Sequence, residues 1–294
     1  FLKIQEGCNN FCTYCIVPYT RGRERSRNFE EVIADAQHAV DKGFHELILT
    51  GVNTCQYFDN GRTLYDVVRA VSAIKGDFRI RLSSTEPKMD NIELLKVIAD
   101  PANKVCRFLH LSMQHASDNI LKKMNRHGGS AVINDAVSRL RKEIPGVVIR
   151  TTFIVGFPGE TDEDFNELCE FVNKQRFEHV GVFTYSREEG TPAYKMEQID
   201  EQIKQDRYDI IMRDQLLINE EYNEKKLGTL VKVLCEGYDP VSEAYFGRSA
   251  ADAPDIDGKI YFTGKKGIKA GTFVDVRIEE VIEYDLCGAA EKIY

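Results

Sequence analysis

The sequence predicts an α/β fold in two parts, a parallel sheet covered by helices and, after it, a small antiparallel β-barrel. From residue 1 to about residue 190, short apolar runs alternate with amphipathic stretches, which is the pattern of repeated β/α units. From about residue 228, β-rich runs separated by Gly, Pro and Asp follow one another without a helical pattern. A long charged stretch lies between the two patterns. We therefore expect a core domain at 1–195, a linker helix at 196–227 and a barrel domain at 228–294.

The first part is expected to contain six strands with helices between them. The apolar runs place the strands at 2–4, 44–49, 78–82, 107–113, 147–155 and 180–185. The amphipathic stretches place the helices at 29–40, 64–74, 90–99, 117–124, 131–144 and 161–173. Thr161 and Asp164 have the spacing of a capping box, which satisfies free N–H groups at the start of a helix. Strands of this kind pair in parallel, so their carboxyl ends should meet at one rim, where ligands bind.

The linker and the barrel follow from two different patterns. Apolar residues recur at helical positions in the charged stretch at 195–226, namely Ile199, Ile203, Ile210, Ile211, Leu217 and Ile218. The β-rich runs after it place five strands at 230–234, 244–246, 259–262, 273–278 and 281–284. Five short strands are typical of a small, OB-like antiparallel barrel.

Composition and charge argue against several classes of protein. The 294 residues are 43% hydrophobic and 29% charged, as in ordinary globular proteins. The chain has neither an apolar run of membrane-spanning length nor a signal-peptide pattern, so we expect no membrane partner. Eight cysteines without paired spacing argue against a secreted disulfide framework, and we expect a cytoplasmic protein. A net charge of −8 argues against bulk attraction to nucleic acid.

Cys8, Cys12 and Cys15 form a C-x3-C-x2-C motif directly after the first predicted strand. Three thiolates on one short loop can hold three irons of a [4Fe–4S] cluster, which leaves the fourth iron open to a small molecule. A structural zinc site is the first alternative, but it normally has four closed ligands. Packing is the second, but Asn9, Asn10 and Thr13 between the thiols make a poor core strand. We therefore predict an iron–sulfur cluster.

Polar residues and glycines also follow the later predicted strands. They include Gly51, Asn53, Ser83, Glu86, Gln114 and Gly156. Each is compatible with an ordinary strand-ending turn as well as with a ligand site. Arg150 opens an apolar strand, so its charge needs a partner, either a structural carboxylate or the carboxylate of a bound molecule.

The cysteine motif on a β/α scaffold resembles the radical S-adenosylmethionine (SAM) superfamily. The resemblance implies an incomplete (β/α)6 barrel whose open iron binds the amino and carboxylate groups of SAM. It also implies reductive cleavage of SAM to a 5′-deoxyadenosyl radical, which abstracts a hydrogen atom. Tyr14 matches the aromatic residue beside the adenine. The other SAM contacts that the resemblance implies are Gly51, Asn53, Ser83, Glu86, Gln114, Arg150 and Gly156.

One branch of the superfamily, the methylthiotransferases, is similar over nearly the whole chain. The matching segments are 6–15, 18–22, 26–27, 114–118, 156–161, 185–186 and 190–191. The resemblance implies that one SAM supplies a methyl group and another the radical, so that a methylthio group replaces a hydrogen on carbon. The terminal barrel resembles the TRAM domain of that family, which docks the substrate.

Within this branch, segments 247–258 and 283–286 resemble the RimO type, which modifies an aspartate of a small-subunit ribosomal protein. From residue 229 on, eight basic and twelve acidic residues give a charge of −4, which suits a basic protein better than RNA. Segments 50–53 and 81–84 are more similar to branches that modify tRNA adenosine, and Cys287 stands where the RimO type has tryptophan. A tRNA methylthiotransferase is therefore the first alternative, and a non-catalytic zinc or nucleic-acid-binding module the second.

The resemblance also implies partners outside this sequence. The family has an upstream domain with three more cysteines for a second [4Fe–4S] cluster, and Phe1 in place of a starting methionine leads us to expect residues upstream. The other five cysteines of the chain are too scattered to replace that site. They are Cys55, Cys106, Cys169, Cys235 and Cys287. A reducing electron donor and a sulfur donor are the further expected partners.

Overall fold

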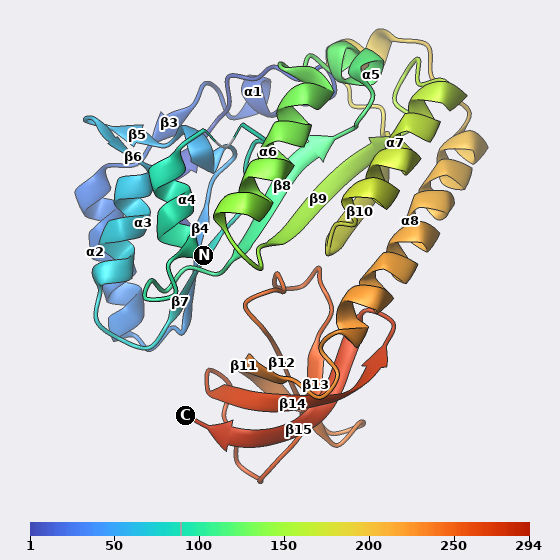
Figure 1. Ribbon diagram of the computed structural model, residues 1–294. Coiled ribbons are helices and arrows are strands. Elements are labelled where there is room, and N and C mark those ends of the chain that lie inside the picture. Colours follow the sequence, from blue (N-terminus) through green and yellow to red (C-terminus); the bar gives the residue numbers. More distant parts are fainter. Residues whose placement is uncertain (89) are drawn as a thin grey trace.

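The structure is a computed structural model that describes residues 1–88 and 90–294 (Figure 1). Two three-stranded parallel sheets form the first part. The first sheet has the order β1-β4-β7, and its strands are β1 (Leu2–Lys3), β4 (Glu46–Thr50) and β7 (Arg79–Leu82). The second has the order β10-β9-β8, and its strands are β10 (His179–Thr184), β9 (Val148–Val155) and β8 (Phe108–Gln114). Isolated bridges between Ile80 and Val105 and between Thr85 and Leu111 connect the two sheets. The predicted parallel sheet covered by helices is confirmed.

Helices cover one face of both sheets (Figure 1). They are α2 (Phe29–Asp41), α3 (Leu64–Ala73), α4 (Ile92–Ala99), α6 (Gly129–Glu143) and α7 (Asp162–Gln175). Each turns an apolar side to the sheets, and one continuous core results. The capping box at Thr161 and Asp164 forms as predicted, whereas α4 begins with Asn91, and not Asp90, as its N-cap.

Short elements link the main ones at the rim. They are β2 (Gln5–Glu6), β3 (Arg25–Ser26), β5 (Phe58–Asp59), β6 (Arg62–Thr63), α1 (Val17–Thr20), α5 (Asp118–Lys123) and the 3-10 turns η1 (Thr54–Gln56) and η2 (Pro192–Lys195). The antiparallel pair β2 and β3 flanks the cysteine loop and holds its two ends together.

The long helix α8 (Glu201–Glu224) packs along β10 with a face that is partly polar. Ile211 and Ile218 are buried as predicted, but Ile203, Ile210 and Leu217 are exposed. Buried polar residues take their place because the strand and its flanks leave carbonyl oxygens that need donors. Lys204 Nζ donates to the carbonyl of Tyr185 at 3.1 Å, Gln215 to Phe177 at 3.0 Å and Asn219 to Glu178 at 3.0 Å. Among the described residues, no helix is long and apolar enough to cross a membrane.

The last part is a closed five-stranded barrel with the order β11-β12-β13-β15-β14. Its strands are Leu230–Asp239, Ala244–Arg248, Ile260–Thr263, Phe273–Ile282 and Asp285–Ile293, given in chain order from β11 to β15. The small barrel is confirmed, but the predicted position of its fifth strand was wrong. The run at 281–284 ends β14 and turns at Glu283, which has a φ of +53°, so the fifth strand follows it. The other pairs of the barrel are antiparallel, and only β13 and β15 pair in parallel among the described strands of the barrel, because closure brings these two strands together without a hairpin.

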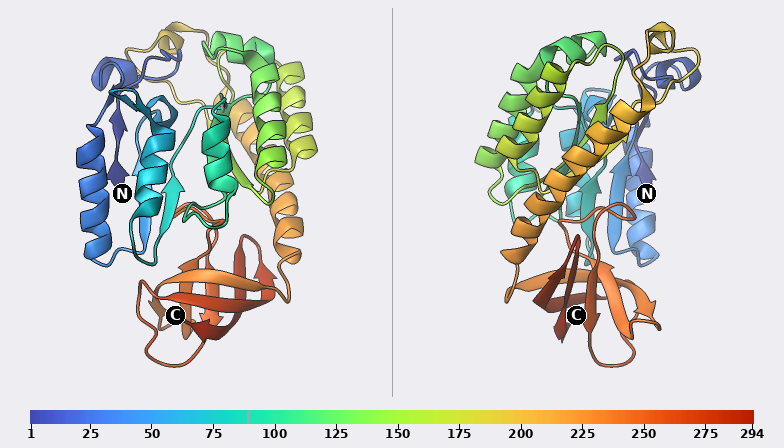
Figure 2. Two further views of the ribbon diagram at one scale, coloured as in Figure 1. Left: turned by 60° about the vertical axis from the view of Figure 1, so that its left-hand side comes forward. Right: turned by 90° about the vertical axis from the view of Figure 1, so that its right-hand side faces the viewer.

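The barrel closes the end of the sheets opposite the rim, and its β12–β13 loop extends toward the strands (Figures 1 and 2). Glu46 lies at the centre of this contact, with its carboxylate 2.7 Å from Arg79 Nη2, 2.7 Å from Arg81 Nε and 3.1 Å from Arg248 Nη2. Arg248 belongs to the barrel, so one buried carboxylate joins both parts. Although burial opposes ionisation, the three arginines hold the pKa of Glu46 at about 2.

Candidate functional site

The cysteine loop lies at the rim formed by the carboxyl ends of the strands, and neighbouring segments hold its backbone. Cys8 N donates to the carbonyl of Gly22 at 3.2 Å, and Thr13 N donates to Met124 at 3.0 Å. Asn125 Nδ2 donates to the carbonyls of Asn10 and Phe11 at 3.2 and 3.0 Å. The loop is therefore tied both to the β2–β3 pair and to the end of α5.

The three thiols differ in their surroundings. Cys12 is buried and accepts a long hydrogen bond from Arg126 Nη1 at 3.9 Å, while the half-buried Cys8 accepts one from Asn10 N at 3.4 Å. Burial raises the pKa of the Cys8 and Cys15 thiols, and the adjacent thiol of Cys12 raises both further. No group of three His, Cys, Asp or Glu side chains within 1–88 and 90–294 has the arrangement of a metal site. Metal binding would thus require the thiols to deprotonate and turn toward one another.

Gly7 supports the loop through a contact that no side chain could replace. Its φ is +72°, and a Cβ atom would lie 2.1 Å from the carbonyl oxygen of Arg23. We expect Gly7→Ala to displace the cysteine loop and to lower the iron content after anaerobic reconstitution. Because the clash adds to the backbone strain, the free energy of unfolding should fall by more than the roughly 1–3 kcal/mol that such strain alone costs. Gly43→Ala is the matched control, because Gly43 has a φ of +82° with nothing within 4 Å. Equal iron content in the two variants would contradict this role.

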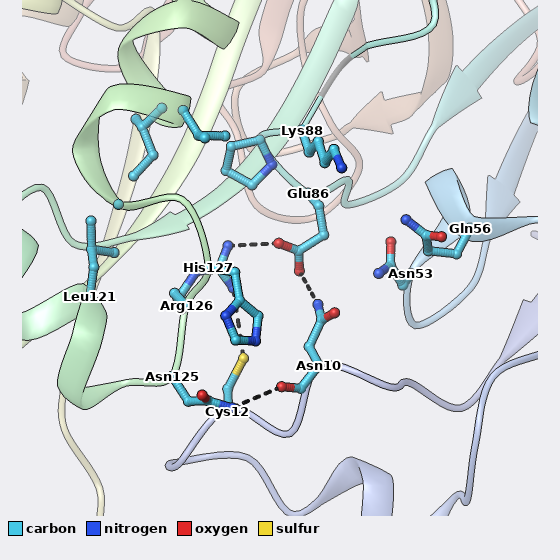
Figure 3. Close-up of a pocket in the computed structure, with 14 residues that line it drawn as sticks. Asn10, Cys12, Asn53, Gln56, Glu86, Lys88, Leu121, Asn125, Arg126 and His127 are labelled. Atoms are coloured by element: carbon cyan, nitrogen blue, oxygen red, sulfur yellow. Dashed lines mark hydrogen bonds and ion pairs between the residues drawn. The ribbon is translucent and has the colours of Figure 1, made fainter.

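A pocket of about 250 Å³ lies beside Cys12 (Figure 3). Glu86 stands at its centre and accepts from Asn10 Nδ2 and from Arg126 Nη2, each at 2.9 Å. Asn53 is 3% exposed, lines the same pocket, and its Oδ1 has no hydrogen-bond partner among the described residues. The lining of the pocket therefore contains a carboxylate, a guanidinium, an amide oxygen without a partner among the described residues and the thiol of Cys12.

The other predicted site residues lie in different surroundings. Tyr14 packs edge-on against Phe157 with ring centroids 6.4 Å apart, and burial raises the pKa of its hydroxyl. Gln114 ends β8 with a φ of +71°, which is strained for a residue other than glycine and is typical of functional positions. Ser83 has a buried Oγ without a partner among the described residues.

The two predicted glycines have structural roles. A Cβ atom on Gly51 would lie 2.9 Å from Gln5 Oε1, and one on Gly156 would lie 2.2 Å from Lys204 Cγ. Gly156 N also donates to Glu160 Oε2 at 3.0 Å. These contacts explain both glycines without a ligand, so neither is evidence for one.

Arg150 lies apart from the pocket, near the barrel. Its Nε is 3.0 Å from Asp257 Oδ1, in the β12–β13 loop. The strand starts at Val148, so Arg150 is near the end opposite the rim. Arg150 thus has a structural carboxylate as its partner and does not line the pocket beside Cys12.

Comparison with known proteins identifies the architecture. Residues 2–172 match the family described as the radical SAM superfamily. This chain belongs to that superfamily. Residues 227–290 match the TRAM domain, so the closed barrel is of that type. Membership in the radical SAM superfamily implies a [4Fe–4S] cluster and SAM as cofactors.

Two relatives have the same name, ribosomal protein uS12 methylthiotransferase RimO. The protein of Acetivibrio thermocellus is 45% identical over 295 residues, which cover 98% of this chain and 64% of that protein. The protein of Clostridium perfringens strain SM101 is 46% identical over 292 residues, which cover 98% of this chain and 65% of that protein. This radical SAM chain thus spans less than two thirds of the length of these curated relatives.

Two solved structures resemble it in fold alone. Coproporphyrinogen III oxidase HemN of Escherichia coli has a TM-score of 0.53 at 15% identity and covers 94% of this chain and 68% of its own. SuiB of Streptococcus suis bound to S-adenosylmethionine has a TM-score of 0.54 at 15% identity and covers 74% of this chain and 48% of its own.

The sequence analysis missed Asn125 and Arg126, which follow α5. Arg126 has a side chain that is 8% exposed, and it joins Glu86 to the carbonyl of Ser112 and to Cys12. In the sequence, Arg126 is simply a charged residue after a short helix. It would indicate a site only if it were buried, because a buried charge needs a partner. Its partner is 40 positions away, which no local pattern indicates.

Proposed function

We propose that the chain holds the catalytic and substrate-docking parts of a methylthiotransferase that modifies an aspartate of ribosomal protein uS12. The observation that carries this proposal is 41–46% identity over at least 98% of the chain to proteins of that name. Barrel charge supports a protein substrate, because twelve acidic residues outnumber eight basic ones from residue 229 on.

Within this proposal, Cys8, Cys12 and Cys15 hold three irons of the cluster. The donor set fits, because iron–sulfur clusters use Cys thiolates and are tuned by hydrogen bonds to sulfur such as that from Asn10 N to Cys8 Sγ. When bound, the cluster and SAM supply a 5′-deoxyadenosyl radical. A second cluster, a sulfur donor and an electron donor remain predictions from the family resemblance.

The pocket residues have separate tasks in this proposal. Glu86 pairs with the ammonium group of SAM, and Arg126, beside Cys12, attracts its carboxylate. The unpaired Oδ1 of Asn53 accepts a hydrogen bond from the same ligand, which removes the cost of a buried oxygen without a donor. Tyr14, Ser83 and Gln114 remain candidates for the adenosine contacts.

Mass spectrometry in cells tests the substrate. The complete gene product is expressed in a bacterium that lacks its own uS12 and tRNA methylthiotransferases. We expect a methylthio group on the uS12 aspartate and unmodified tRNA adenosine. Methylthiolated tRNA with unmodified uS12 would instead support the tRNA alternative. Colourless protein with stoichiometric zinc after anaerobic reconstitution would reject both enzyme proposals in favour of a binding module.

A further inference from the structure

The segment that carries the cysteine loop is basic, although the whole chain is acidic. Residues 1–28 contain five basic and two acidic residues and thus carry a charge of +3, whereas the whole chain carries −8. The basic residues are Lys3, Arg21, Arg23, Arg25 and Arg27, and the acidic ones are Glu6 and Glu24. None of these seven lines the pocket beside Cys12. The proposed cofactor contacts therefore leave this local excess of positive charge unused.

Much of this charge lies on the surface around a single carboxylate. Three cations share Glu6, at N–O distances of 2.8 Å (Lys3), 2.9 Å (Arg25) and 3.8 Å (Arg21). The side chains of Arg21 and Arg25 are 66% and 58% exposed. Because one carboxylate balances only one of the three cations, two positive charges remain in excess and face water.

Arg23 joins this charge to the cysteine loop itself. Its guanidinium lies 4.4 Å from the ring centroid of Phe11, the residue before Cys12, and it forms no ion pair within the described residues. Phe11 packs edge-on against Tyr19 with ring centroids 5.6 Å apart, and Tyr19 is 55% exposed. Glu24 follows Arg23 in the chain and offsets one of the charges. The name loop surface is used below for Phe11, Tyr19, Arg21, Arg23 and Arg25.

The loop surface and the pocket use different residues of the cysteine loop. Asn10 and Cys12 line the pocket, whereas Phe11 between them packs against Tyr19 and Arg23. The pocket, at about 250 Å³, has the size of a small-molecule site and cannot admit a protein. A protein that exchanges electrons with a cluster on this loop must therefore contact the loop through its other residues. Exposed arginines beside aromatic side chains are typical of protein interfaces, and an excess of positive charge attracts an acidic partner.

A nucleic acid fits the loop surface less well than an acidic protein. Binding to a nucleic-acid backbone takes many phosphate contacts over a broad basic face. Here Glu6 and Glu24 interrupt the arginines, and the net charge of −8 repels a long polyanion. An acidic protein needs only a few complementary charges to be steered to the surface and oriented on it.

We propose that the loop surface docks an acidic, low-potential protein that carries single electrons and reduces the cluster. One electron leaves the carrier, which is oxidised, and enters the cluster, which is reduced. No bond forms or breaks, and no proton moves. Because electron transfer slows steeply with distance, docking beside Cys12 favours it. This inference rests on the cluster that the proposed function assigns to Cys8, Cys12 and Cys15.

Calorimetry with an oxidised plant-type [2Fe–2S] ferredoxin, which is acidic and of low potential, tests the docking. It uses the complete protein with its cluster reconstituted. We expect Arg23→Glu to weaken ferredoxin binding by roughly 10-fold at low salt, because like charges would then face each other. The difference should shrink at high salt, which screens exposed charges. Arg21→Gln, which leaves Glu6 with two cations, should weaken binding in the same direction by a smaller factor.

Arg213→Glu is the matched control for Arg23→Glu. Arg213 is exposed, and its replacement changes the net charge by the same amount. It belongs to α8, which lies across the molecule from α1 and the cysteine loop (Figure 1). We expect it to bind ferredoxin as the wild type does. Equal weakening in the two variants, or no weakening in Arg23→Glu, would overturn the docking surface.

The rate of 5′-deoxyadenosine release separates docking from SAM cleavage. With reduced ferredoxin as donor, we expect Arg23→Glu to lower kcat/KM for ferredoxin by roughly 10-fold. With reduced methyl viologen, a small cation that needs no docking surface, the variant should equal the wild type. An equal loss with both donors would mean that Arg23 only supports the loop, which would overturn the proposal.

Two further outcomes separate this inference from its alternatives. If Arg23→Glu loses binding to a single-stranded RNA but keeps ferredoxin binding, the surface belongs to a nucleic acid and the proposal fails. If the wild type does not cleave SAM even with methyl viologen, the proposed cluster itself is rejected, and with it the inference that rests on it.

Discussion

Cys8→Ala is expected to reduce SAM cleavage to the background rate and to remove most of the bound iron. The thiol would supply one of three protein ligands, and two thiolates leave two irons of a [4Fe–4S] cluster without protein ligands. Cys8 is half-buried, and within residues 1–88 and 90–294 its Sγ accepts from the Asn10 amide alone, so alanine costs little packing. Iron and sulfide content, the visible spectrum and 5′-deoxyadenosine release after anaerobic reconstitution measure the effect.

Cys287→Ala is the matched control for this variant. Cys287 is also partly buried, but it lies on β15 of the barrel next to Tyr261, far along the chain from the cysteine motif. We expect it to retain the iron content and SAM cleavage of the wild type. Full SAM cleavage by Cys8→Ala, or equal iron loss in the two variants, would show that the C-x3-C-x2-C loop does not hold the cluster.

Glu46→Gln is expected to destabilise the folded protein by about 3–5 kcal/mol, the usual cost of removing one partner from a buried ionic group. The side chain is 6% exposed and lies between Arg79, Arg81 and Arg248. A neutral amide would leave three buried guanidinium groups with one fewer negative charge. Because Arg248 belongs to the barrel, the loss should also loosen the contact between the two parts. Chemical denaturation at pH 7 and limited proteolysis near residue 228 measure both effects.

The same residue predicts a dependence of stability on pH. Burial opposes its ionisation, but the three arginines lower the pKa of Glu46 from 4.5 to about 2. A lowered pKa means that the carboxylate stabilises the fold above about pH 4.5 and that this contribution is lost as the pH falls toward 2. In Glu46→Gln, this part of the acid dependence should be missing from denaturation curves measured between pH 5 and pH 2.5.

Glu30→Gln serves as the control for charge removal. Glu30 pairs with Arg62, but its side chain is 72% exposed, so the pair is screened by water. We expect a change within about 0.5 kcal/mol, as for most exposed pairs. Equal stability of Glu30→Gln and Glu46→Gln would mean that the buried network does not hold the two parts together.

Local patterns predicted most of the fold, because they depend on neighbouring residues. Alternating apolar runs located the parallel strands, and the capping box at Thr161 and Asp164 formed as expected. The predictions failed where distant segments decide the outcome. The buried face of α8 is polar because its side chains donate to carbonyl groups beside the two ends of β10. The last barrel strand, β15, begins only after a turn at Glu283.

The sequence by itself determined the cysteine loop, the alternation of strands and helices around it and the superfamily, because the motif spacing and the β/α pattern are local. Only the tertiary structure decided which distant charges meet. It joined Glu86 to Arg126 beside Cys12, Glu46 to Arg248 across the two parts, and Arg150 to Asp257. The physical reason is that a buried charge needs a partner, but the chain can supply that partner from any position that folding brings within about 3 Å.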